Sequence, residues 1–321
     1  MNKPTVYIDQ NIIGLMLDGK INLTERPEFY WVYSTEHFAE IRRSSNAAKY
    51  LSALESIGAK LLKLDLDHNF KIIGTAQLIK HGTPSQHYKD YIEATGGVDI
   101  SENLFDPFLA WINGGGHKGL LEKLPDNLAE QLLNITKDLP EAHSSLLANR
   151  LDVLTPEFNR VIEQLAEQGN DISESRKSMG GGKGAIGGIR GEKQIQQIWN
   201  IIGPTFAAVS CEQFFGFDPI EKQGYQKWPT YLGIVGCCAV MDIIGFQAEG
   251  KKSRKIEKLP NVRSDSVHIA MGAFCSAILS GDKRLIKRAK AIYEYKKIGN
   301  SPILIERKAK TIQSTTEATA D

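Results

Sequence analysis

The chain has 321 residues, and its 41% hydrophobic content is ordinary for a globular protein of one large domain or two. A formal net charge of +1 gives no overall attraction for nucleic acid, so any basic binding site has to be local. The four cysteines include one adjacent pair and no C-x-x-C motif. That pattern argues against a zinc site or a disulfide framework and indicates a reducing compartment.

Two further features concern where the protein resides. The N-terminal residues MNKPTVYID lack the apolar core of a signal peptide. The longest apolar stretch, residues 232–246, is interrupted by Asp242 and is shorter than a membrane span. We therefore expect a soluble cytoplasmic protein with no membrane segment.

The first part of the chain, residues 1–68, has the pattern of an α/β unit. Short apolar runs predict strands at 5–9, at 31–34 and from 62 onward. Between them the pattern predicts a short helix that stops near Gly19 and a longer helix over 35–57, which Ser34 can cap.

The pattern then changes, because residues 69–257 have few strand signals and several stretches of helical periodicity. These helical stretches are at 127–139, 158–169, 192–202 and 231–245. Strand and helix signals resume over 258–308, with strands near 274–280 and 302–307 and a helix over 283–297. The polar tail, 309–321, is predicted to be disordered. We expect one α/β unit built from both ends of the chain and interrupted by a large, mostly helical insertion.

Four acids lie near the strand ends or on the helices of this α/β unit: Asp9 at the end of the first strand, Glu40 on the helix predicted over 35–57, Asp265 near a helix start, and Asp282 after the strand near 274–280. A βα fold brings such positions together at the carboxyl end of its sheet. Two carboxylates about 5 Å apart at an effective dielectric of about 20 repel by roughly 3 kcal/mol, so a cluster must hold protons or a cation. Hard divalent ions such as Mg²⁺ favour carboxylates, waters and substrate phosphates. Each acid could instead cap a helix or pair with a neighbouring base.

Read in order, the end segments carry four short motifs: Asp9-Gln10-Asn11 after the first strand, Ser34 followed by Glu40, Asp265 before Ala270 and Ala273, and Ser280 next to Asp282. In this order the motifs resemble those of the PIN-domain nuclease family. The resemblance covers roughly residues 4–65 and 258–308. It implies a PIN-like fold, with a central parallel sheet flanked by helices.

The resemblance also implies an activity, which is metal-dependent hydrolysis of RNA or, less often, of single-stranded DNA. Mg²⁺ or Mn²⁺ would bind the four acids, with Asp9 and Asp265 as direct ligands. Three neighbouring side chains are expected to support the ligands from behind: Asn11, Ser280 and His268. An endoribonuclease with a toxin, defence or RNA-processing role is the function expected, and the insertion could bind a protein inhibitor or activator.

Basic residues near the expected site are candidates for nucleic-acid binding. Four lie on the helix predicted over 283–297, and two lie in the glycine-rich stretch 175–193: Lys283, Arg284, Lys287, Arg288, Lys183 and Arg190. Such side chains would contact phosphates and position a substrate without reading its sequence. Solvated charge on the helix and a surface loop in the glycine-rich stretch are the alternatives.

Two other functions stay open at the level of sequence. The first is a non-catalytic PIN-like scaffold that binds nucleic acid or a partner protein. The second is a nucleotide-binding enzyme that uses the loop Gly180–Gly191. This loop lacks the spacing of a P-loop, because Lys177 stands where the motif needs its first glycine and Gly184 stands where it needs a hydroxyl.

Overall fold

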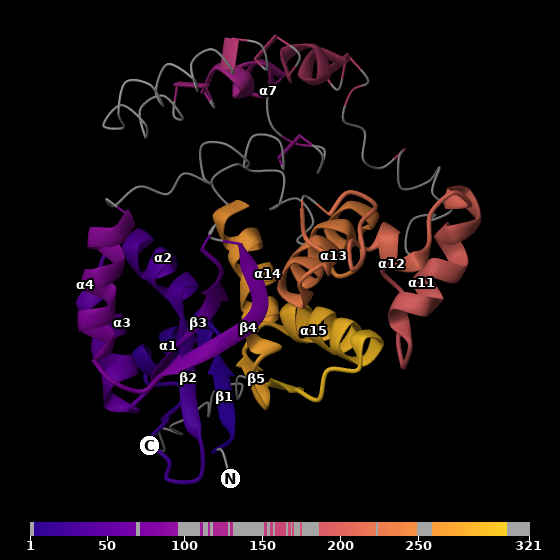
Figure 1. Ribbon diagram of the computed structural model, residues 1–321. Coiled ribbons are helices and arrows are strands. Elements are labelled where there is room, and N and C mark those ends of the chain that lie inside the picture. Colours follow the sequence, from indigo (N-terminus) through magenta and orange to yellow (C-terminus); the bar gives the residue numbers. More distant parts are fainter. Residues whose placement is uncertain are drawn as a thin grey trace, which may run out of the picture.

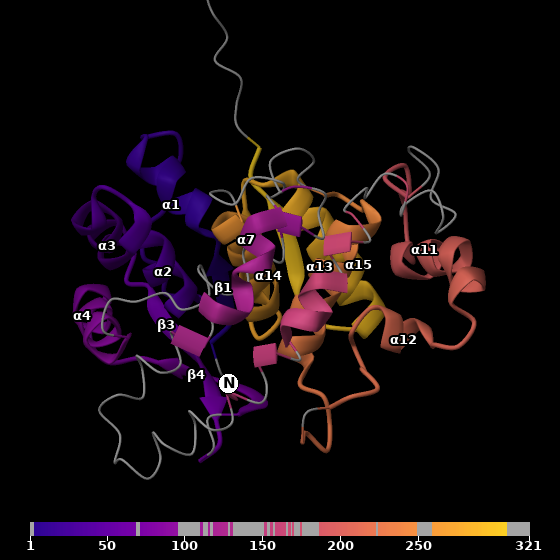
Figure 2. The same ribbon diagram turned by 90° about the horizontal axis from the view of Figure 1, so that it is seen from above.

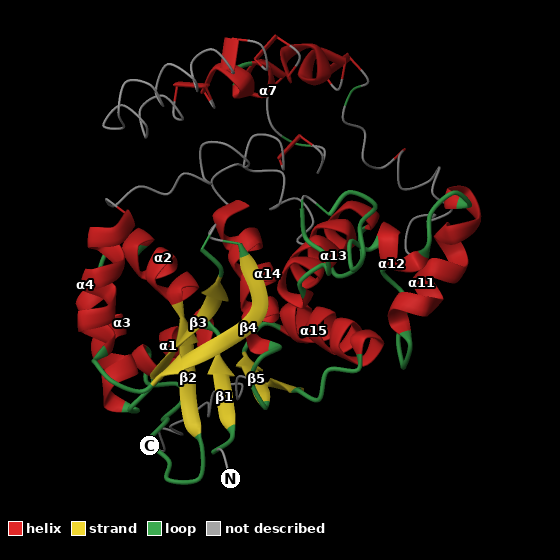
Figure 3. Ribbon diagram, viewed as in Figure 1, coloured by secondary structure: helices red, strands yellow, loops and turns green. Residues whose placement is uncertain are grey.

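The computed structural model describes residues 3–68, 71–95, 186–222, 224–248 and 259–306, together with short stretches between residues 110 and 174. A six-stranded sheet forms its middle layer, with strand order β4-β3-β2-β1-β5-β6 (Figure 3). The strands are β1 (Thr5–Ile8), β2 (Tyr30–Ser34), β3 (Lys60–Leu66), β4 (Ile72–Ile79), β5 (Ala277–Ser280) and β6 (Ser301–Leu304). All neighbours are parallel except β3 and β4.

Helices cover both faces of the sheet (Figures 1 and 2). On one face lie α1 (Gln10–Leu17), α2 (Thr35–Arg43), α3 (Ala47–Ser56) and α4 (Pro84–Thr95). On the other lie α13 (Thr230–Ile244), α14 (Leu259–Gly272) and α15 (Lys283–Lys296), with α11 (Gln194–Ile202), η1 (Gly203–Phe206) and α12 (Cys211–Phe214) further out. A short helix, α7 (Lys118–Glu122), belongs to the sparsely described middle of the chain. The protein is therefore an α/β protein, as the sequence predicts.

The central strand β1 joins the two ends of the chain. It pairs with β2 on one side and with β5 on the other, where Ile8 is in register with Leu279. Parallel neighbours require a crossover, and helices provide it between β1 and β2, between β2 and β3, and between β5 and β6. Segments near the two termini of the chain therefore build one sheet.

The sheet extends beyond the boundary that we placed at residue 68. Strand β4 lies within the predicted insertion and pairs antiparallel with β3, with Leu61 opposite Ile79. It is an edge strand, and its more buried positions include the small residues Gly74 and Ala76. Because small residues give a weak hydrophobic alternation, the strand signal was too faint to be recognised.

The helix predicted over 35–57 is two helices in the structure. Helix α2 ends at Arg43, Ser44 is extended, and Asn46 caps α3 by accepting a hydrogen bond from the main-chain N–H of Lys49. Serine and asparagine side chains compete with helical backbone hydrogen bonds, which explains the break. Helix α1 ends where predicted, with Gly19 beyond it at a φ of 66°.

The second half of the predicted insertion packs directly on the sheet. One buried apolar cluster combines Tyr7 and Val32 with residues between 186 and 246 and with residues of α14 and α15. The helices expected at 192–202 and 231–245 are α11 and α13. Since α13 shares this core, it is part of the main body, and the boundary placed at 257 does not separate two cores. Most of the helix predicted at 127–139 and the whole tail 309–321 lie outside the described residues.

No helix among the described residues is long and apolar enough to span a bilayer.

Candidate functional site

The carboxyl ends of β1 and β5 lie side by side, and each is followed closely by an acid. The main-chain N–H of Asp9 donates to the carbonyl of Leu279 at 2.9 Å. The hydroxyl of Ser280 then donates to Oδ2 of Asp9 at 2.6 Å. This pairing buries Asp9, which is 3% exposed, at the centre of the carboxyl edge of the sheet.

Asn11 connects the same two strand ends. Its amide nitrogen donates to the Asp9 carboxylate and to the hydroxyl of Ser280, the latter at 3.1 Å. Its amide oxygen accepts the main-chain N–H of Gly281 at 2.7 Å. A Cβ at position 281 would lie 3.1 Å from that oxygen, so glycine permits the close approach. Asn11 and Ser280 thus hold Asp9 in place, which is the supporting role that we expected of them.

Asp282 is the N-cap of α15. Its Oδ1 accepts the main-chain N–H groups of Arg284 at 2.6 Å and Leu285 at 3.2 Å. The capping alternative therefore describes this residue correctly. Asp282 nevertheless lines the same cavity as the other three acids, so one carboxylate both starts the helix and contributes negative charge to the site.

Glu40 on α2 and Asp265 on α14 complete the set. The four acids line one cavity of about 410 Å³, together with Gln10, Asn11, Gly14, Tyr50, Asn261 and Val262. Asp265 is half-buried, and among the described residues none donates a hydrogen bond to its carboxylate. The structure therefore brings together four acids from four separate elements, and one of them, Asp265, accepts no hydrogen bond from any described residue.

Burial and mutual repulsion make these carboxylates reluctant to ionise. Burial raises the pKa of Asp9, and the charges of Glu40 and Asp282 raise it further, while His268 and Ser280 oppose the effect. Burial also raises the pKa of Asp265 well above its ordinary range, with added contributions from Asp9 and Asp282. Shifts of this kind, caused by desolvation and like charges, are typical of functional sites.

His268 supplies the positive charge that partly balances the acids. Its Nε2 lies 3.0 Å from Oε2 of Glu40 and 3.7 Å from Oδ1 of Asp9, and its Nδ1 lies 2.8 Å from the hydroxyl of Tyr7. Burial lowers its pKa, but Glu40 and Asp9 outweigh that effect and raise the pKa to about 10. The side chain is fully buried, so it supports Glu40 from behind and does not face the cavity.

Sequence analysis missed Tyr7, whose hydroxyl contacts Nδ1 of His268. The hydroxyl of Tyr7 lies 2.7 Å from the hydroxyl of Ser34, at the end of β2, in a buried chain of contacts. Tyr7 lies inside a strand and carries no local motif, so only the fold shows its role. Glu36, one turn before Glu40, accepts a hydrogen bond from Ser264 and does not line the cavity.

The residues predicted to bind nucleic acid differ in their exposure to solvent. Lys283 and Arg190 are exposed, while Arg284 and Lys287 are partly exposed. Desolvation and the nearby charges of Arg190 and Lys283 lower the pKa of Lys287, so these three side chains lie near one another, and we call them the basic patch. Arg190 also closes that turn by donating to the carbonyls at 187 and 189. Lys183 lies outside the described residues.

The prediction that Arg288 contacts nucleic acid is wrong. Its side chain is 3% exposed and forms a buried ion pair with Asp242 of α13. One guanidinium nitrogen also donates to the carbonyl of Gln247 at 3.0 Å. The run of charges on α15 concealed the fact that position 288 faces inward, because helical periodicity places it on the same side as Leu285 and Ile292.

The donors around the cavity fit a hard divalent cation. Four carboxylates converge on it, and such ions prefer oxygen ligands that carry charge. Within the described part of the chain, no three His, Cys, Asp or Glu side chains have their donor atoms close enough to hold a metal ion as they stand. Coordination would therefore require some of the carboxylates to turn further into the cavity.

Comparisons of the chain with protein-family models, with curated proteins and with solved structures found no match.

Proposed function

We propose that the protein is a metal-dependent nuclease, most simply an endoribonuclease, whose active site is the cavity lined by Asp9, Glu40, Asp265 and Asp282. The observation that carries the proposal is that four acids from distant parts of the chain line one cavity at the carboxyl edge of a parallel sheet. Ligands bind at this edge in open α/β folds. The pKa values of Asp9 and Asp265 are raised, so ionising these acids is costly unless a cation lies nearby.

The roles of the residues follow from their contacts. Asp9 and Asp265 would hold Mg²⁺ or Mn²⁺ directly, because Asp9 is fixed by Ser280 and Asn11, and Asp265 has no donor in the part of the chain that the structure describes. Glu40 and Asp282 would bind it directly or through water. A bound divalent cation of this kind activates a water molecule and stabilises the charge that develops on a phosphodiester. His268 would keep Glu40 oriented, since it donates to that carboxylate from a fully buried position.

The positively charged side chains near the cavity favour a phosphodiester substrate. Helix α15 begins at Asp282 and carries Lys283, Arg284 and Lys287, next to Arg190. Phosphates of a strand entering the cavity would lie against these side chains, which position the backbone without reading its sequence. RNA is the substrate class expected from the family resemblance, and a toxin, defence or RNA-processing role is compatible with it.

Cleavage of end-labelled single-stranded RNA and DNA tests the proposal, with Mn²⁺ and with Asp265→Asn as the matched variant. We expect the wild-type protein to cut RNA, and we expect the cutting to disappear in EDTA and in the variant. Asp218→Asn is a suitable control, because Asp218 is exposed and paired with Lys222 at 2.6 Å, away from the cavity. Isothermal titration of Mn²⁺ provides a second readout. If the wild-type protein neither cuts nor binds Mn²⁺, the catalytic proposal fails and the scaffold alternative remains.

A further inference from the structure

Beside its four acids, the acidic cavity has a wall that carries no charge. The residues of this uncharged wall come from α1, α3 and α14: Gln10, Asn11, Gly14, Tyr50, Asn261 and Val262. Gln10 and Gly14 are four residues apart, so about 6 Å of α1 borders the cavity beyond the strand end that carries Asp9. A substrate held at the acids therefore has further protein surface to lie against.

The glycine at position 14 is not explained by the protein itself. Gly14 lies in the interior of α1 and does not have a positive φ. A Cβ placed on it would meet no atom of the described residues within 4 Å, its own helix aside. Glycine is among the least favourable residues in a helix interior. Neither the backbone conformation nor the packing therefore requires glycine here.

Another helical glycine shows the contrast. A Cβ on Gly272 of α14 would lie 2.8 Å from Ile278 and 2.9 Å from the hydroxyl of Tyr293, so packing excludes a larger residue there. At Gly14 the equivalent space is the acidic cavity. A glycine that faces a cavity leaves the helix backbone bare, which lets a ligand approach it closely.

Tyr50 provides an aromatic surface in the same wall. It lies on α3, which packs against α1, and its side chain is half-buried. Tyr50 packs against the buried apolar cluster that contains Ile12, Ile13 and Leu54, and it also lines the cavity. Bases of single-stranded nucleic acids stack on aromatic side chains of this kind, and every base can do so because each has a π face.

We propose that the uncharged wall holds the nucleoside next to the bond that the nuclease cuts, with its sugar passing over the bare backbone at Gly14 and its base stacked on Tyr50. The assignment of this nucleoside to the cut bond rests on the proposed function. The substrate is then a single strand of any sequence, because stacking does not distinguish the bases and a paired base is not free to leave its duplex.

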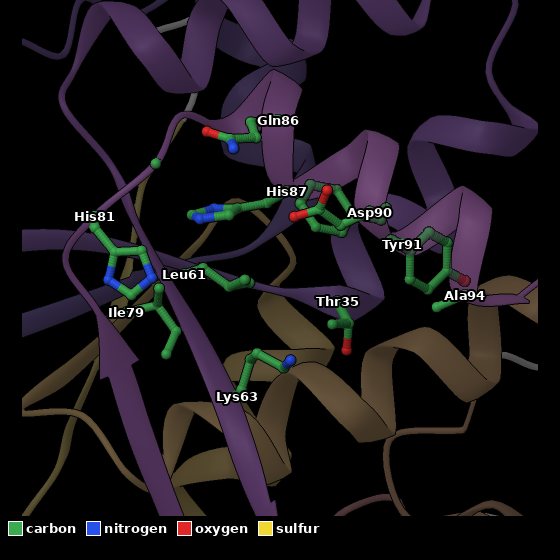
Figure 4. A pocket seen from close by; sticks show the side chains of 12 residues that line it. Thr35, Leu61, Lys63, Ile79, His81, Gln86, His87, Asp90, Tyr91 and Ala94 are labelled. Atoms are coloured by element: carbon green, nitrogen blue, oxygen red, sulfur yellow. The ribbon is translucent and has the colours of Figure 1, made fainter.

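A second cavity, of about 510 Å³, does not offer an equivalent surface (Figure 4). It is lined by residues of α2, β3, β4 and α4, and helical periodicity places its Phe38 on the opposite side of α2 from Glu40. Phe38 is fully buried, whereas Lys63 and Asp90 at the rim are exposed to solvent. Tyr50, rather than Phe38, is therefore the aromatic side chain that a substrate at the acids can reach.

Replacing Gly14 by alanine tests the close approach. Because alanine is the better helix former and its Cβ meets open space, Gly14→Ala should raise the melting temperature by about 2 °C. In contrast, kcat/KM for single-stranded RNA should fall by about tenfold or more, since the added methyl displaces the substrate from the acids. A purely structural role would not move stability and activity in opposite directions.

Gly236→Ala is the matched control. Gly236 lies in the interior of α13, is half-buried like Gly14 and does not line the cavity. A Cβ there would lie 3.7 Å from the backbone of Gly216, which is an ordinary contact. This variant should gain similar stability and keep the wild-type kcat/KM.

Stacking on Tyr50 is tested by fluorescence anisotropy of labelled oligomers of A, C and U, with Asp265→Asn as the background so that nothing is cut. Tyr50→Leu should weaken binding of all three by about tenfold or more, whereas Tyr50→Phe should retain it. For a duplex, neither substitution should change the affinity.

The results separate this inference from the proposed function. Unchanged kcat/KM in Gly14→Ala, unchanged affinity in Tyr50→Leu, an equal loss in Tyr50→Phe, or no binding of any strand by the parent protein would overturn the inference. If the wild-type protein neither cuts RNA nor binds Mn²⁺, the proposed function fails. Weaker strand binding in Gly14→Ala and Tyr50→Leu would then still support the uncharged wall as a strand-binding surface.

Discussion

At the scale of single residues, Asp265 shows why the acidic cavity needs a functional explanation. Its carboxylate is half-buried, has no hydrogen-bond donor among the described residues and lies near the charges of Asp9 and Asp282. Burying a charge without partners opposes folding. The raised pKa of Asp265 expresses that cost, because a folded-state pKa above the unfolded one means that ionisation weakens the fold.

We therefore predict that Asp265→Asn stabilises the metal-free protein. Stability linked to Asp265 is present at low pH and is lost as the pH rises through its raised pKa, so an amide that cannot ionise should be favoured at pH 7. The melting temperature should rise by a few degrees at pH 7, and the difference should shrink on acidification. In scanning calorimetry, Mn²⁺ should stabilise the wild-type protein and leave the variant unchanged. A variant that melts below the wild type at pH 7 would contradict the argument.

A second prediction at this scale concerns the charge on His268. Removing one partner of a buried ion pair costs about 3–5 kcal/mol, so His268→Gln should reduce the free energy of unfolding by about 3 kcal/mol at pH 6. The pKa of His268 is raised to about 10, so its stabilising contribution is complete below its ordinary pKa and is lost as the pH rises through 10. The difference between wild type and variant in urea unfolding should therefore shrink between pH 8 and pH 10.

Tyr7→Phe serves as the control for that experiment. It removes the hydroxyl that contacts Nδ1 of His268 and Ser34 but leaves the charge in place. Its cost should be about 1 kcal/mol, typical of a hydrogen bond, and nearly independent of pH over the same range. An equal pH dependence for both variants would show that His268 is not the group responsible.

At the scale of elements, the buried ion pair of Arg288 and Asp242 connects α15 to α13. Helix α15 begins at Asp282 in the acidic cavity, and α13 comes from the segment that we had assigned to the insertion. The guanidinium also lies close enough to influence the pKa of Asp265. One pair therefore joins the C-terminal part of the α/β unit to the later part of the middle segment.

We predict that Arg288→Met alone lowers the free energy of unfolding by about 3–5 kcal/mol, because it removes the guanidinium that forms an ion pair with the buried Asp242 carboxylate. Adding Asp242→Leu should recover much of that loss, since a well-packed apolar pair can replace a buried ion pair. A double-mutant cycle from urea unfolding measures the coupling. Additive losses would mean that the two residues stabilise the fold independently.

At the scale of the whole molecule, positive charge is local in a chain whose net charge is only +1. The basic patch of Lys283, Lys287 and Arg190 begins next to Asp282, which lines the acidic cavity, so attraction for a polyanion would be strongest on that side of the site. Binding driven by such contacts depends on salt, because phosphates release counterions when they are neutralised.

We predict that Lys283→Ala with Lys287→Ala reduces the salt dependence of RNA binding. Two lost contacts to a single strand should lower the slope of log affinity against log salt concentration by about 1.4. Fluorescence anisotropy with an Asp265→Asn background measures binding without cleavage. Lys222→Ala, which removes a charge paired with Asp218, should leave the slope unchanged. If the slopes are equal for all three proteins, the basic patch does not contact the RNA.

The sequence by itself determined the α/β class and the positions of most strands and helices. It also indicated that both ends of the chain contribute strands to the sheet. These follow from local patterns, such as the apolar run before Asp9, the Ser34 cap and the short strand before Asp282. It also placed Asp9 and Asp282 after strands and Glu40 on a helix, whereas Asp265, expected near a helix start, lies in the middle of α14. Local patterns failed at β4, where small residues weaken the alternation, and at the break between α2 and α3.

Only the tertiary structure decided which side chains share a cavity and which face the core. It turned Arg288 inward to Asp242, joined Tyr7 and His268 behind Glu40, and brought Gly14 and Tyr50 to the acidic cavity. None of these pairings has a sequence signal, because contact between distant residues depends on how helices pack against the sheet. Burial and charge interactions arise from that packing, so the pKa shifts that point to function exist only in the folded chain.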